Sequence, residues 1–136
     1  MSRENVEIVR EGFLASGSGD PVAARRYFDQ AIEWDMSGVV GWPEQDVYRG
    51  QLEVEQFLQA WADSWGGTWH YDVDEVLDAG EDQVFVAIHE WGTGAESGAD
   101  VDQRRYFAAI LREGQMARVR MFSDRADAPE AVALRE

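Results

Sequence analysis

The period of the apolar residues changes partway along the chain, and this change predicts the order of the elements. In residues 3–16, apolar side chains recur every three or four positions from Val6 to Phe13, which predicts a helix with one buried face. Asp20 and Pro21 follow a glycine-containing break, and such a pair is typical of a helix start. We therefore expect a second, short helix to end near residue 28.

Two further elements precede the strand-rich half of the chain. Alternating residues predict a short, half-buried strand at 32–36. Residues 37–49 have two glycines and a proline and no sustained period, which predicts an ordered loop that carries Trp42 and Tyr48. The strongest helical pattern covers residues 51–65, where the apolar side chains share one face: Val54, Phe57, Leu58, Trp61 and Trp65.

From residue 69 onward the pattern predicts strands in series. Residues 69–77 alternate, and the unbroken apolar run 84–88 between glycines predicts a central strand that is covered on both faces. Segments 101–112 and 115–123 are joined by a two-residue Glu-Gly turn, which is typical of a tight hairpin. A closing helix is expected at about 126–134.

Helices followed by an antiparallel meander predict an α+β fold, in which the helices lie together on one face of the sheet. We expect a single domain over residues 1–136, with a strongly curved antiparallel sheet wrapped around the helix at 51–65. Trp61 and Trp65 then point into a tapered space that the inner face of the sheet encloses.

Composition and charge exclude several classes of partner. With 12 basic and 27 acidic residues, the net charge is −15, and this field repels phosphate backbones and anionic lipids, so neither nucleic acid nor a membrane is expected as a partner. The absence of cysteine excludes disulfides and zinc-cysteine sites, and with two histidines in the sequence we expect no metal cluster. No cofactor is predicted. The amphipathic start and the lack of a long apolar run predict a cytoplasmic protein.

Several motifs in order resemble one known group of proteins. They are ENVEIVREGF, GDP, EWDMS, GWPEQDVYRG, EVEQFLQAW, LDAGEDQVFV and REGQMARVRMFSDRADA. Together they resemble the nuclear transport factor two-like superfamily and its SnoaL-like branch. The resemblance implies a cone-shaped α+β barrel, a homodimer through the outer sheet face, and a pocket for a small-molecule ligand. It implies no single activity, because isomerases, cyclases, hydrolases and transport factors share this fold.

The resemblance also implies candidate catalytic positions. Asp35 stands where the base of ketosteroid isomerases follows the first strand. Phe13 and Phe107 stand at the positions of the two oxyanion donors, and neither side chain can donate a hydrogen bond. Without such donors we do not expect efficient steroid isomerisation, since removing one donor typically lowers the rate about a hundredfold to a thousandfold. Strand alternation places Asp35 opposite Trp34, so its other interpretation is a solvated acid at a strand edge.

Other polar residues have two interpretations each. SnoaL-like cyclases use an acid on the last strand, where the nearest candidate is Asp124, which can instead cap the closing helix. His89 can act as a general base, or it can be a core histidine bonded to a neighbour such as Tyr48 or Glu90. Either Arg104 or Arg105 must face inward, and we expect it to pair with a carboxylate of the protein.

The six tryptophans and other aromatic residues suggest the wall of a pocket for a small, largely apolar, cyclic molecule. Three hypotheses stay open: an acid-base enzyme of cyclase or isomerase type that uses Asp35 or His89, a non-catalytic binding protein, and a structural dimerisation module whose tryptophans fill the cone. The residues expected to contact a ligand are Phe13, Trp34, Tyr48, Trp61, Trp65, Trp91, Arg105, Phe107 and Phe122.

Overall fold

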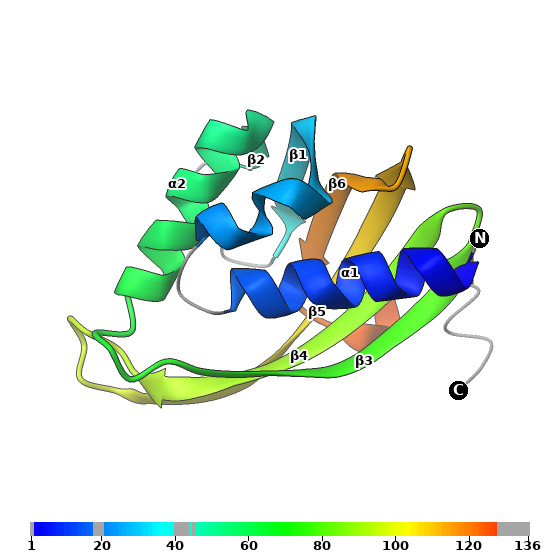
Figure 1. The fold of residues 1–136 in the computed structure, drawn as a ribbon. Coiled ribbons are helices and arrows are strands. Elements are labelled where there is room, and N and C mark those ends of the chain that lie inside the picture. The colour runs from blue at the N-terminus through cyan, green and yellow to red at the C-terminus, as the bar shows by residue number, and fades with distance from the viewer. Residues whose placement is uncertain (1, 18–20, 40–43, 45, 128–136) are drawn as a thin grey trace.

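The computed structural model describes residues 2–17, 21–39, 44 and 46–127. Helices and strands follow the order that the sequence predicts (Figure 1). The helical elements are α1 (Ser2–Ser16), the 3-10 helix η1 (Pro21–Tyr27), α2 (Gly50–Asp63) and the 3-10 turn η2 (Arg125–Asp127). The strands are β1 (Phe28–Gly38), β2 (Val47–Arg49), β3 (His70–Gly80), β4 (Gln83–Thr93), β5 (Asp100–Arg112) and β6 (Gln115–Phe122).

One curved sheet carries the strands in the order β2-β1-β6-β5-β4-β3. The predicted meander from β3 to β6 is confirmed as antiparallel. The sheet as a whole is mixed, because β1 runs parallel to β6. It is also not closed into a barrel, since the edge strands β2 and β3 lie at opposite ends of the order. The α+β class is therefore confirmed, with an open, mixed sheet in place of the expected antiparallel barrel.

Irregular pairing bends the sheet around the helices. The register shifts between Val73 and Glu75 in β3 and between Phe28 and Glu33 in β1, and such irregularities increase the local bend and twist of a strand. As a result α1, η1 and α2 all lie on the concave face (Figure 1). Arg25 of η1 donates two hydrogen bonds, of 2.8 and 2.7 Å, to the buried carboxylate of Glu55 and so holds α2 against η1.

The tight hairpin between β5 and β6 is confirmed by its backbone. Glu113 and Gly114 both have positive φ, 52° and 77°, as a two-residue turn between twisted strands requires. The strand β2 was not predicted; it pairs with β1 and places Tyr48 beside Trp34. Trp42 lies outside the described residues, and so does most of the predicted closing helix, of which the structure describes only the turn η2.

Apolar side chains pack on both faces of the sheet, as the run at 84–88 predicts. Val84, Val86 and Ile88 belong to the main core beneath the helices. Phe85 and Ala87 belong to a second cluster on the outer face, where Arg125 lies over the Phe85 ring at 5.1 Å. None of the described helices is long and apolar enough to cross a membrane. The cytoplasmic location stays a prediction.

Candidate functional site

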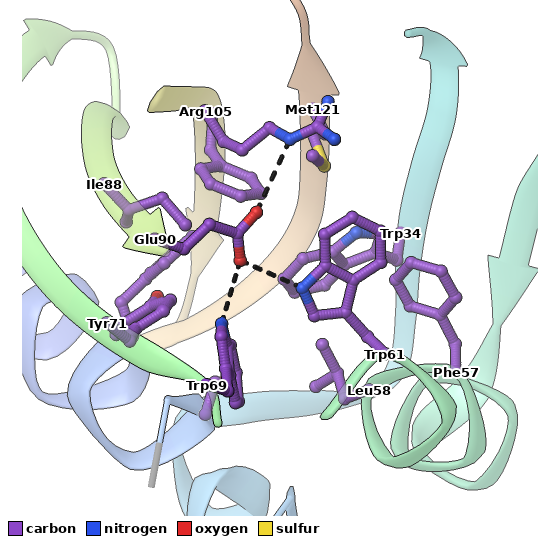
Figure 2. A pocket seen from close by; sticks show the side chains of 13 residues that line it. Trp34, Phe57, Leu58, Trp61, Trp69, Tyr71, Ile88, Glu90, Arg105 and Met121 are labelled. Atoms are coloured by element: carbon purple, nitrogen blue, oxygen red, sulfur yellow. Dashed lines mark hydrogen bonds and ion pairs between the residues drawn. The ribbon is translucent and has the colours of Figure 1, made fainter. Parts of the chain in front are cut away.

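A cavity of about 40 Å³ lies on the concave face, between α1, α2 and the sheet (Figure 2). Most of its wall is aromatic or aliphatic, and its polar groups come from few residues. The lining residues are Phe13, Ser16, Trp34, Phe57, Leu58, Trp61, Trp69, Tyr71, Ile88, Glu90, Arg105, Phe107 and Met121. The site is thus an apolar pocket with polar groups grouped around one carboxylate.

Glu90 is that carboxylate, and it is completely buried. The indole nitrogens of Trp61 and Trp69 each donate to its Oε1 at 3.0 Å. Gln103 Nε2 donates to Oε2 at 2.8 Å, and Arg105 Nε lies 3.5 Å from the same oxygen (Figure 2). Every one of these groups is a hydrogen-bond donor or carries a positive charge, so the carboxylate is held by complementary partners on both of its oxygens.

Arg105 provides the positive charge beside Glu90. Its guanidinium carbon lies 5.4 Å from the centre of the Trp61 ring, and its side chain is only 19% exposed. The 3.5 Å separation from Glu90 makes an ion pair but not a hydrogen bond, and Arg105 Nε has no acceptor among the described atoms. The predicted internal salt bridge of the inward arginine is confirmed, with Arg105 as the inward residue; Arg104 pairs with Asp74.

Tyr71 of β3 places a phenol in the same wall. Burial and the nearby charge of Glu90 raise the pKa of Tyr71 above its ordinary value of 10.0. Its hydroxyl therefore stays protonated across the physiological range and is available as a hydrogen-bond donor. Its ring packs edge-on against Trp69 at 5.2 Å, which fixes its position.

The structure brings five of the predicted ligand-contact residues together in the cavity wall and places four elsewhere. Phe13, Trp34, Trp61, Arg105 and Phe107 line the cavity. Tyr48 stacks on Phe57 at 4.4 Å from outside the wall, and Trp65 stacks on Trp69 at 6.5 Å beyond the end of α2. Trp91 and Phe122 project to the outer face. Trp91 lies across from His70 of β3, and Phe122 lies across from Tyr106 of β5 in the outer cluster.

Asp35 also lies on the outer face, in the phase opposite to Trp34. It is 4% exposed, so it is not the solvated edge acid that alternation suggested. Ser37 donates to it through both its backbone nitrogen and its hydroxyl, and Arg118 donates at 2.8 Å. Burial alone would raise the pKa of Asp35, but these hydrogen bonds and the charge of Arg118 lower it below 3.8. Asp35 thus ties β1 to β6 on the side of the sheet away from the cavity.

His89 and Asp124 are likewise distant from the cavity wall. His89 Nε2 lies 2.7 Å from Asp102, and the imidazole stacks on Trp91 at 4.5 Å. Its partner is therefore neither Tyr48 nor Glu90, because β4 turns His89 outward and Glu90 inward. Asp124 is exposed and accepts a hydrogen bond from the Ala126 nitrogen at 2.9 Å, as a cap residue does.

The sequence interpretation missed eight of the lining residues, and among them are Glu90, Tyr71 and Trp69. The signal for Glu90 was present, because it shares the phase of Val84, Val86 and Ile88 on β4. Within the described part of the chain, no group of three or more His, Asp or Glu side chains could hold a metal ion.

No protein-family model and no curated protein matches this sequence. Solved structures do match. An NTF2-like protein from Burkholderia xenovorans LB400 is 22% identical, with a TM-score of 0.69 over 91% of this chain and 92% of the other. A putative SnoaL-like polyketide cyclase from Jannaschia sp. CCS1 is 20% identical, with a TM-score of 0.69 over 90% and 87%.

A third structure, TerC co-crystallised with polyporic acid, is 16% identical, with a TM-score of 0.73 over 97% of this chain and 95% of the other. The chain therefore has the cone-type α+β fold of NTF2-like and SnoaL-like proteins. At these identities the likeness extends to the fold and not to an activity.

Proposed function

We propose that this protein binds a small, largely apolar, cyclic molecule in the cavity beneath α2. The observation that carries the proposal is the composition of the cavity wall, in which aromatic rings surround a single group of polar side chains built on Glu90. Apolar walls with few, well-placed polar groups are typical of sites for small organic ligands. TerC, which has the same fold, was co-crystallised with polyporic acid, and this supports a small organic ligand here.

The size of the cavity adds a requirement. A space of about 40 Å³ holds water molecules, whereas sites for organic ligands usually measure about 300 to 1,000 Å³. A ligand must therefore displace side chains of the wall. Leu58 and Trp61 of α2 are the natural ones to move, because both are only partly buried, whereas four of the lining side chains on the strands belong to the buried core.

The surroundings of Glu90 favour binding over acid-base catalysis. A general base needs a lone pair directed at the proton that it removes. Both carboxylate oxygens of Glu90 already accept hydrogen bonds from protein donors. Among the described lining residues Glu90 is the one carboxylate, and a catalytic role would require it to leave these partners.

A second candidate is the structural module, and the small cavity favours it, since the open space measures about 40 Å³. Binding to a variant with a wider cavity separates the two candidates. Leu58→Ala removes part of the wall and should tighten binding of acetophenone at least threefold relative to wild type, because less side-chain displacement is then needed. Nuclear magnetic resonance titration of the ¹⁵N-labelled protein measures the affinity.

Leu52→Ala is the matched control for this experiment. It makes the same change on the same helix, but Leu52 is 70% exposed and does not line the cavity. Its affinity for acetophenone should equal that of wild type. If neither wild type nor Leu58→Ala binds at millimolar concentration, the ligand-binding proposal is overturned and the structural module is favoured.

We extend the proposal to a homodimer through the outer sheet face. Phe85 and Ala87 are already buried within one chain, so the contact would use the neighbouring part of the face, where Ile110 is 41% exposed. Sedimentation equilibrium should give twice the chain mass of 15.4 kDa, and Ile110→Asp should shift the protein toward monomer. A wild-type protein that stays monomeric at 100 µM would end this part of the proposal.

A further inference from the structure

Two N–H groups of the cavity wall have no hydrogen-bond acceptor among the residues that the structure describes. They are Nε1 of Trp34 and Nε of Arg105, and both atoms are buried. Both side chains line the cavity, and Trp34 is 3% exposed. By contrast, the indole nitrogens of Trp61 and Trp69 in the same wall are both bonded to Glu90. Of the three indole N–H groups and the Arg105 Nε–H group in the wall, two are thus satisfied and two are unsatisfied.

Unsatisfied buried donors are rare in folded proteins, and they destabilise the fold unless something else accepts from them. Trp34 and Arg105 reach the cavity from different strands, β1 and β5, with Met121 of β6 also in the wall. Figure 2 shows the side chains of Arg105, Met121 and Trp34 in this wall. A ligand oxygen is an acceptor of the kind that both of these N–H groups lack.

The charges around the cavity indicate that this acceptor is uncharged. Arg105 is already paired with Glu90, so the wall is neutral as a whole. A ligand carboxylate would lie near Glu90 without a cation of its own, and a buried unpaired charge is costly. The net charge of −15 also opposes the approach of anions. A ligand cation would face the guanidinium of Arg105.

We infer that the ligand carries a neutral carbonyl oxygen, which accepts hydrogen bonds from Trp34 Nε1 and Arg105 Nε while its ring lies against the aromatic wall. The inference rests on the proposed ligand-binding function and specifies the chemical class of the ligand. Trp34 and Arg105 are then the residues that select a ketone over a hydrocarbon of the same shape. A hydrocarbon ligand would leave both donors unsatisfied.

Acetophenone and α-methylstyrene form a suitable pair of probes, because a C=O group in one replaces a C=CH₂ group of similar shape in the other. The quantity compared is the affinity for acetophenone divided by the affinity for α-methylstyrene. We expect this ratio to be about threefold to tenfold lower in Trp34→Phe than in wild type, because the variant keeps a ring but loses the N–H group. Comparing ratios cancels the difference in hydration between the two probes. Benzoate, the anionic probe, should bind at least tenfold more weakly than acetophenone.

Trp65→Phe is the matched control, since it removes another buried indole N–H group that has no acceptor among the described residues, but from a side chain that does not line the cavity. The affinity ratio should be unchanged in this variant. The Nε1–H resonance of Trp34 gives a second readout in the wild-type protein: it should move downfield with acetophenone and stay in place with α-methylstyrene. This readout decides alone if Trp34→Phe does not fold.

The outcomes separate this inference from the proposed function. If both probes bind but the ratio is the same in wild type and Trp34→Phe, or the Trp34 resonance does not respond to the ketone, the carbonyl inference is overturned and the binding function stands. Tighter binding of benzoate than of acetophenone would overturn it as well. If no probe binds to wild type or to Leu58→Ala, the proposed function fails and the inference fails with it.

Discussion

Replacing Glu90 with leucine is expected to lower the free energy of unfolding by about 3 to 5 kcal/mol, because removing one partner of a buried ion pair leaves the other charge uncompensated. Glu90 is fully buried, and Arg105 is mostly so. The substitution also deprives the indole N–H groups of Trp61 and Trp69 of their acceptor. Leucine has a similar volume, so the loss reports the polar network and not a cavity. Urea denaturation followed by circular dichroism measures it.

Two further variants show where this energy comes from. Glu90→Gln keeps an acceptor for the two indoles but loses the charge opposite Arg105, and a loss of about 1 to 3 kcal/mol is expected. The double variant Glu90→Leu with Arg105→Met removes both charges and should recover at least half of the loss, since replacing both partners of a buried pair is often nearly neutral. A single Glu90→Leu variant within 1 kcal/mol of wild type would contradict the description of the site.

Hydrophobic periodicity predicted most of the fold because the elements follow local rules. The stripe on α1 that includes Phe13, the Glu113–Gly114 turn and the apolar run of β4 each specify a local conformation with little help from distant residues. The parallel pairing of β1 with β6 is a contact between the two ends of the chain. No periodicity in either segment records such a partner.

The candidate site was predicted less completely for a physical reason. Alternation shows which side chains share a face, but it does not show which face meets the helices. On β4 the interpretation chose His89, whereas the cavity lies on the side of Glu90. The resemblance to isomerases made Asp35 a candidate base, but the structure places it in a salt bridge with Arg118 on the outer face. The size of the cavity depends on side-chain packing that no pattern encodes.

Glu90 illustrates how tertiary structure determines the role of a residue. From sequence alone, a glutamate between a histidine and a tryptophan on a strand is an ordinary polar residue. Its burial follows from three separate segments, which supply Trp61 from α2, Trp69 from the end of the α2–β3 connection, and Gln103 from β5. The donors converge only after the sheet has curved around α2.

Trp34→Ala is expected to lower the free energy of unfolding by about 3 to 5 kcal/mol, which is typical of deleting a large aromatic side chain from a core. Trp34 is 3% exposed and lies at the centre of a group of rings. Its ring centre is 5.9 Å from that of Phe107 and 6.2 Å from those of Phe13 and Phe57. These rings come from α1, α2, β1 and β5, so the helices and the sheet lose a shared contact. Urea denaturation measures the change.

Trp91→Ala is the matched control, because it deletes the same side chain from the opposite face of the sheet. Trp91 is only partly buried and contacts two imidazoles, His70 at 5.3 Å and His89 at 4.5 Å. Its loss should cost about 1 kcal/mol, the order expected for ring contacts at a partly exposed site. Equal losses for Trp34→Ala and Trp91→Ala would contradict the placement of the core on the concave face. A larger loss at Trp34 supports that placement, and with it the cavity whose wall this ring forms.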